Sequence, residues 1–268
     1  MARTRVRFAS LLALSAALAL VTGCAEGDGT ASKDDAPAHE GGKPVVVVTT
    51  TWEGAFAKAA GARDVKVIVP QSVHHAPDYD PKPSDLAAVG KADFVLYAPF
   101  EPYAAKIKEA AGSKAKLVEV NLDNDSDKVR AEVARLGQLF GTGAAAAQWT
   151  TSFDAEYAKL SKDVQGAWPG GQSPAVVSQV FTTWSAKLAG ATPVGTYGPE
   201  AVTPAQLAEL SGKKPALVLD NAHMSTGTVL PDSGAKQVEI VNYPGEDLDL
   251  LPVFRNAAAG LKKAMGGS

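Results

Sequence analysis

The chain has 268 residues, of which 46% are hydrophobic and 21% charged, and its formal net charge at pH 7 is −3. This length can bury a sizeable core, in one large domain or in two modest ones. The acidic balance argues against nucleic acid as a partner, because binding to a phosphate backbone needs an excess of Lys and Arg.

The first 23 residues have the pattern of a secretion signal. Three arginines precede an apolar run over residues 11–21, which suits a signal peptide core and is too short to span a bilayer. The run ends in Val-Thr-Gly before Cys24, and small residues before a cysteine resemble the bacterial lipobox. We therefore expect cleavage after residue 23 and acylation of Cys24, which would anchor the protein to the outer face of the bacterial cytoplasmic membrane. The periplasm is the alternative location. The alternative is an ordinary secretory signal with an incidental cysteine.

Residues 24–43 follow as a predicted flexible tether. They are rich in Gly, Ala, Asp and Lys and nearly free of large apolar side chains, so they cannot bury enough surface to fold. Cys24 is the only cysteine, which excludes an intramolecular disulfide. Loss of residues 1–23 would leave 245 residues and, because three arginines are removed, change the formal charge from −3 to −6.

Strand-like and helix-like segments alternate over residues 44–125. The β-branched run at residues 45–48 is typical of a strand that is buried on both faces. Further strands are expected at residues 65–69, 94–97 and 117–120. Helices are expected at residues 52–60, at residues 86–89 with Ser84 as N-cap, and at residues 101–111. Strands separated by helices imply right-handed crossovers and a parallel sheet.

Residues 126–168 interrupt the alternation with apolar residues at helical spacing. Gly141-Thr142-Gly143 divides this pattern, which predicts either one long helix with a kink or two helices. A second alternating unit then occupies residues 169–268. Its strands are expected at residues 175–180, 191–194, 217–219 and 238–241, and its helices at residues 182–188, 204–210 and 247–265.

The predicted fold class is therefore α/β, with two lobes over residues 44–125 and 169–268. Each lobe would be a parallel sheet flanked by helices, and a long connecting helix over residues 126–168 would join them. Open α/β sheets bind ligands at the carboxyl ends of their strands, which predicts a cleft between the two lobes.

The loop from Pro70 to Asp85 is the most distinctive segment at such a strand end. It holds His74 and His75, two of the four histidines of the chain, together with three carboxylates. Imidazoles beside carboxylates suit a borderline cation such as zinc. The alternative is a solvated turn, since the spacing matches neither Cys-x-x-Cys nor His-Glu-x-x-His.

Three stretches of sequence carry a resemblance to a known family. They are Val-Thr-Thr-Thr-Trp at residues 48–52, Tyr-Asp-Pro-Lys-Pro-Ser-Asp-Leu at residues 79–86 and Lys-Ala-Asp at residues 91–93. With these motifs the chain resembles the zinc/manganese-type substrate-binding lipoproteins of bacterial ABC importers, over nearly all of its mature length. The resemblance implies two parallel-sheet lobes with a divalent metal between them, and an ABC permease in the cytoplasmic membrane as partner. It implies no enzyme activity, and we expect a monomer.

The family's metal ligands carry over only in part. Its first histidine stands two residues before the tyrosine, where this chain has Pro77, whereas His75 stands four residues before Tyr79. Its second histidine falls in residues 121–125, which contain no histidine. The third and fourth ligands align with residues that remain candidates for the cleft, Gln179 and Asn242.

Asp220 and His223 offer a replacement, because they follow a strand of the second lobe at the edge of the cleft. With His74 and His75 they would supply three nitrogens and one oxygen, a ligand set that zinc accepts, with manganese or another divalent metal as alternatives. The competing interpretation is that Asp220 caps a following helix and that His223 is a surface residue. Further residues expected at the cleft are Tyr79, Trp52, Gln179 and Asn242.

Three other functions stay open. The same fold could bind a metal chelate or a small organic ligand, with aromatic residues such as Trp184 and Tyr243 lining the pocket. A hydrolase is a second alternative, although the candidate nucleophiles Ser72, Ser178 and Ser225 lack a Gly-x-Ser-x-Gly motif. The third is a surface lipoprotein without a transport role that binds a partner protein.

Overall fold

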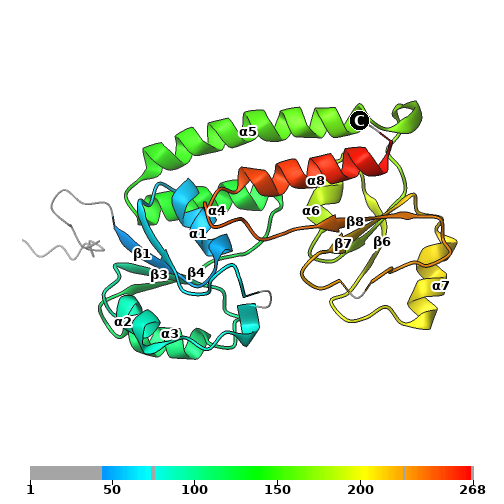
Figure 1. Ribbon diagram of the computed structural model, residues 1–268. Helices are drawn as coiled ribbons and strands as arrows, with labels where there is room; N and C mark the ends of the chain where they lie inside the picture. Colours follow the sequence, from blue (N-terminus) through cyan, green and yellow to red (C-terminus); the bar gives the residue numbers. More distant parts are fainter. Residues whose placement is uncertain (1–43, 74–75, 226, 267–268) are drawn as a thin grey trace, which may run out of the picture. The chain divides into compact units, whose positions relative to one another are not determined.

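The computed structural model describes residues 44–73, 76–225 and 227–266 (Figure 1). Strands and helices alternate along these residues and form two four-stranded parallel sheets, so the predicted α/β fold with two lobes is confirmed. Within the described ranges, no helix is both long and apolar enough to cross a membrane. The expected signal peptide, Cys24, the tether, His74 and His75 lie outside the described residues.

The N-terminal sheet has the strand order β2-β1-β3-β4. Its strands are β1 (Val45–Val48), β2 (Asp64–Val67), β3 (Phe94–Tyr97) and β4 (Lys116–Glu119). Its helices are α1 (Thr51–Ala59), α2 (Pro83–Val89) and α3 (Ala104–Ala111), with a 3-10 turn at Ala76–Asp78. Val46 and Val48 belong to the core beneath α1, whereas Val47 packs with residues of α2 and α3. Because successive side chains of a strand point to opposite faces, this central strand is apolar at every position.

The C-terminal sheet repeats this arrangement in the order β6-β5-β7-β8. Its strands are β5 (Val176–Gln179), β6 (Pro193–Tyr197), β7 (Leu217–Asn221) and β8 (Lys236–Ile240). Its helices are α6 (Thr183–Leu188), α7 (Pro204–Gly212) and α8 (Leu251–Ala264). Leu217 and Leu219 lie in the core with α8, and Val218 lies in a second cluster with Leu210 of α7. Both faces of this sheet are therefore covered as well.

The connecting segment consists of two helices, α4 (Ser126–Leu139) and α5 (Gly143–Gln165), and a 3-10 turn at Pro169–Gly171 follows. Gly141 between them has a φ of +69°, and the Thr142 hydroxyl donates to the Ala60 carbonyl at 2.5 Å. A Cβ atom on Gly137 would lie 2.5 Å from the Cβ atom of Ala146, so glycine allows α4 and α5 to approach closely. Helix α4 packs on α1, and α5 extends to the second lobe, where it lies beside α8 (Figure 1).

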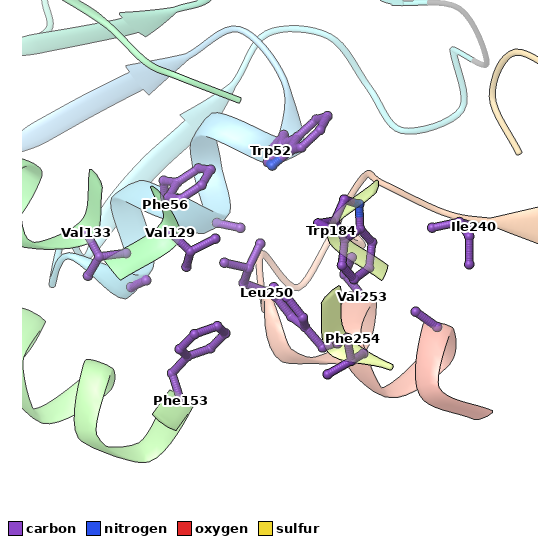
Figure 2. Packing of buried hydrophobic residues seen from close by; sticks show 14 of the residues in the cluster. Trp52, Phe56, Val129, Val133, Phe153, Trp184, Ile240, Leu250, Val253 and Phe254 are labelled. Carbon is purple, nitrogen blue, oxygen red and sulfur yellow. The ribbon is translucent and has the colours of Figure 1, made fainter. Parts of the chain in front are cut away.

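One hydrophobic core runs through both lobes. It includes Trp52 and Phe56 of α1, Phe153 of α5, Trp184 of α6 and Phe254 of α8 (Figure 2). The ring centroid of Phe254 lies 5.1 Å from that of Phe153 and 5.1 Å from that of Trp184. The lobes are therefore joined through packed side chains as well as through the chain itself.

Helix α2 begins earlier than expected. Its N-cap is Lys82, not Ser84, and Pro83 occupies the first helical position, where a missing N–H costs nothing. The Asp85 carboxylate accepts a hydrogen bond from the backbone N–H of Lys82 at 2.9 Å. The acid three residues after the cap thus closes the first turn, and Ser84 lies within the helix instead of capping it.

Candidate functional site

Three contacts join the carboxyl ends of the two sheets. The Thr51 hydroxyl donates to the Pro244 carbonyl at 2.9 Å, and the Asn124 side-chain N–H donates to the Asn242 carbonyl at 3.0 Å. The rings of Trp52 and Tyr243 meet edge to face with centroids 5.1 Å apart. The loop after β8 is therefore held against the start of α1 and the segment between β4 and α4.

Asn242, which aligns with a ligand of the related family, has both ends of its amide engaged. Its Oδ1 accepts from Trp184 Nε1 at 2.8 Å, and its Nδ2 donates to the Phe181 carbonyl at 3.2 Å. The residue is only 2% exposed. It therefore ties the loop after β8 to the segment that leads into α6.

Gln179 lies at the end of β5 and is also buried. Its Oε1 accepts from the backbone N–H of Phe181 at 2.6 Å. Its Nε2 has no hydrogen-bond partner among the described residues. A Cβ atom on Gly198 would lie 3.0 Å from that nitrogen, so the glycine leaves room for the amide. The neighbouring Ser178 is fully buried and bonds to the Gln179 carbonyl at 3.0 Å, so it is not an exposed nucleophile.

Asp220 lies within β7 and is 3% exposed. Its Oδ1 accepts from the Tyr197 hydroxyl at 2.6 Å, and its Oδ2 from Gln237 Nε2 at 3.3 Å. Burial, followed by this hydrogen bond, raises the pKa of Tyr197. No helix begins directly after β7, and the turn there is closed by Asn221, whose Oδ1 accepts from the His223 backbone N–H at 3.1 Å.

His223 is exposed, and its ring centroid lies 4.8 Å from that of Tyr243. It is the one predicted ligand that the structure describes on the surface at a strand end. Across residues 44–73, 76–225 and 227–266, no group of three His, Cys, Asp or Glu side chains could hold a metal ion. A site built on His223 would therefore need side chains outside these ranges.

Tyr79 stabilises the loop that precedes α2. Its hydroxyl donates to Asp85 Oδ2 at 2.8 Å, and its ring packs against the cluster that contains Val47 and Ile107. Burial, followed by the bond to Asp85, raises the pKa of Tyr79 to about 12. The phenol is thus a neutral donor that fixes one end of the histidine-containing loop.

A buried acidic pair was missed in the sequence. Glu53 of α1 is fully buried and Glu101, after β3, is 5% exposed. Burial raises the pKa of Glu53, and burial followed by the charge of Glu53 raises the pKa of Glu101 to about 8. The capping box of Thr50 and Glu53 was a visible signal for the first acid. No local sequence pattern predicts that Glu101 lies near Glu53.

A sequence model of the family described as "ZnuA: Zinc-uptake complex component A periplasmic" matches residues 46–138. This segment comprises the N-terminal sheet, its helices and nearly all of α4. No curated protein sequence matches the chain at a significant level.

The fold is shared with solved structures of metal-related binding proteins. The laminin-binding protein Lmb of Streptococcus agalactiae, described as having adhesin and metal-transporting activity, gives a TM-score of 0.62 at 17% identity, covering 83% of this chain and 99% of that one. AdcAII of Streptococcus pneumoniae gives a TM-score of 0.59 at 17% identity, covering 85% of this chain and 100% of that one. FpvC of Pseudomonas aeruginosa in complex with Mn²⁺ gives a TM-score of 0.63 at 14% identity, covering 84% of this chain and 98% of that one. Residues 46–138 are therefore similar to the zinc-uptake family, and the described chain shares its two-lobed fold with these binding proteins.

Proposed function

We propose that this protein is an extracytoplasmic substrate-binding lipoprotein that captures a divalent metal, zinc in the first place, and delivers it to an ABC permease. The observation that carries the proposal is the match to the zinc-uptake family over residues 46–138, because this range contains the loop with His74 and His75. Capture and release of an ion need no catalysis. Binding from both lobes and release at the permease suffice.

The proposed ligands are His74, His75, His223 and Asp220. His223 is the stronger candidate of the second lobe, because its imidazole is exposed at the end of β7. Asp220 already accepts two hydrogen bonds, so a metal would have to share its remaining lone pairs. We therefore expect His223 to contribute more to metal affinity than Asp220.

Titration calorimetry with zinc tests the proposal. The unmutated protein should bind one equivalent, and the double change His74→Ala plus His75→Ala should abolish binding. His223→Ala should weaken binding at least roughly tenfold, because losing a ligand leaves the coordination shell incomplete. Affinity should also fall below about pH 6, since a ligand histidine must be neutral and its reference pKa is about 6.5.

His39→Ala is the matched control, because His39 lies in the predicted tether and is the remaining histidine of the chain. It should leave zinc affinity unchanged. Absence of binding by the unmutated protein would show that the metal proposal is wrong. If His223→Ala binds as tightly as the parent, the loop histidines have other partners, and Gln179 and Asn242 are the next positions to change.

A metal chelate or a small organic molecule is the second candidate ligand. It is favoured by the aligned ligand positions Gln179 and Asn242, which carry amides whose oxygens already accept hydrogen bonds. Phe100 and Phe181, which follow β3 and β5, are 66% and 52% exposed at strand ends. Exposed aromatic rings suit a ligand with an apolar body. Native mass spectrometry of the purified protein would show such a ligand as a bound mass that a chelator does not remove.

The lipid anchor is tested by Cys24→Ala. We expect this change to move the protein from the membrane fraction to the soluble fraction, because the acyl chains would supply its membrane affinity. Cell fractionation followed by immunoblotting measures the shift, and His39→Ala should remain in the membrane fraction. A Cys24→Ala protein that still sediments with membranes would contradict acylation as the anchor.

A further inference from the structure

The buried pair Glu53 and Glu101 has no counter-charge among the described residues. Across the described ranges, neither carboxyl forms an ion pair with a Lys, Arg or His side chain. An ionised carboxylate removed from water and left unpaired is costly, and two neighbouring ones repel each other. The pair must therefore be neutralised by a proton or by a cation that its oxygens can hold.

Hydrogen bonds account for three of the four carboxyl oxygens. Glu53 Oε2 accepts from the backbone N–H and the hydroxyl of Thr50. Glu101 Oε2 accepts from the Ala98 backbone N–H at 3.1 Å, and its Oε1 accepts from the Tyr103 hydroxyl at 3.2 Å. The remaining oxygen, Glu53 Oε1, is buried and has no partner among the described residues.

A second buried oxygen points to the same place. Thr49, directly after β1, is 0% exposed, and its Oγ1 makes no hydrogen bond of regular geometry to another described residue. Its hydroxyl nevertheless lies close enough to both carboxyls to lower the pKa of each. A buried hydroxyl oxygen and a buried carboxyl oxygen without a regular hydrogen bond among the described residues thus belong to one cluster with the Glu101 carboxyl.

We propose that Thr49, Glu53 and Glu101 form a buried binding site for a hard divalent cation of the Ca²⁺ or Mg²⁺ class. All of its ligands would be oxygens, which such cations prefer over nitrogen or sulfur. Two carboxylates would balance the charge of the ion, and a threonine hydroxyl has lone pairs to offer. Glu53 and Glu101 are its two carboxylate ligands. The Thr49 hydroxyl and water would complete the coordination shell. It shares no ligand with the proposed zinc site.

The position of the site indicates a structural role at the junction of the lobes. It would tie the end of β1 and the start of α1 to the loop after β3. Tyr243, from the loop after β8, lies close by, since burial and then the charges of Glu53 and Glu101 raise its pKa to about 12. A cation between the acids would remove their repulsion and stabilise this region. It would not contact the proposed zinc ligands.

Thermal unfolding of the full-length protein, stripped with a chelator, tests the proposal. CaCl2 or MgCl2 at millimolar concentration should raise the melting temperature by several degrees over NaCl of equal ionic strength, because a ligand of the folded form alone stabilises it. Glu53→Gln, Glu101→Gln and Thr49→Val should each lose most of this rise.

Glu132→Gln and His223→Ala are the controls. Glu132 is another buried acid, 8% exposed, but Arg135 neutralises it at 2.5 Å, so its variant should keep the rise. His223→Ala should keep it too, which separates this site from the zinc proposal. If neither cation raises the melting temperature of the unmutated protein, or if Glu53→Gln keeps the rise, the proposal is overturned.

A second measurement covers the case in which the Glu→Gln variants do not fold. Tb³⁺ is a luminescent substitute for Ca²⁺ that aromatic side chains sensitise, and Tyr103 hydrogen-bonds to the Glu101 carboxyl. Excitation at the aromatic absorbance should produce terbium emission that excess Ca²⁺ displaces and that Thr49→Val reduces at least fivefold. Emission that Thr49→Val leaves unchanged would contradict the site.

Discussion

Replacing Phe254 by alanine is expected to lower the free energy of unfolding by about 3–5 kcal/mol, the usual cost of truncating a buried aromatic side chain. Phe254 is 0% exposed, and its ring meets those of Phe153, Tyr157 and Trp184. These rings come from α5 and α6, so the change leaves a cavity where α8 joins both elements (Figure 2). The loss combines buried apolar area with contacts that the cavity cannot recover.

Urea unfolding followed by circular dichroism and tryptophan fluorescence measures this loss. The two signals should still coincide, because the lobes share one core and should unfold together. Phe100→Ala is the control, since Phe100 is 66% exposed and its loss should change stability by less than about 0.5 kcal/mol. A loss below about 1 kcal/mol at Phe254, or two separated transitions, would contradict a continuous core.

Without divalent cations, the protein is expected to lose stability as the pH rises from 5 to 9. Burial, and next the charge of Glu53, raise the pKa of Glu101 from 4.5 to about 8. Between these values the folded state keeps a proton that the unfolded state has released, so stability falls with rising pH. The contribution is complete below about 4.5 and is lost as the pH passes 8. Since one pKa unit corresponds to about 1.4 kcal/mol, the loss is at most roughly 5 kcal/mol.

Urea unfolding at several pH values in a chelating buffer measures this slope. Glu101→Gln should reduce it, because an amide has no proton to lose, and should make the protein more stable than the parent at pH 9. Any slope that remains is expected from Glu53, whose pKa burial also raises. Glu132→Gln should keep the parental slope, since Arg135 compensates that acid. A parental profile that is flat or rises between pH 5 and 9 would show that the pair is ionised in the folded state. A Glu101→Gln profile as steep as the parental one would show that the slope comes from a group other than Glu101.

The α/β class and the two lobes follow from local patterns in the amino-acid sequence. A run of apolar side chains such as Val45–Val48 by itself predicts a buried strand. The alternation of strand and helix periods is likewise a local pattern. The residues around Gly141 left one or two connecting helices open, because a glycine allows a turn without requiring it. The close packing of Gly137 on Ala146 and the hydrogen bond from Thr142 to Ala60 stabilise two separate helices.

The hydrogen bonds and burial of the polar side chains depend on long-range contacts. Asp220 and Asn242 were reasonable ligand candidates at strand ends, but Tyr197 and Trp184 bring hydrogen bonds to them from distant parts of the chain. Glu53 and Glu101 come together because parallel neighbours β1 and β3 place the segments that follow them side by side. Whether a carboxylate is solvated, hydrogen-bonded or close to another charged group depends on such long-range contacts. Local periodicity contains no information about them.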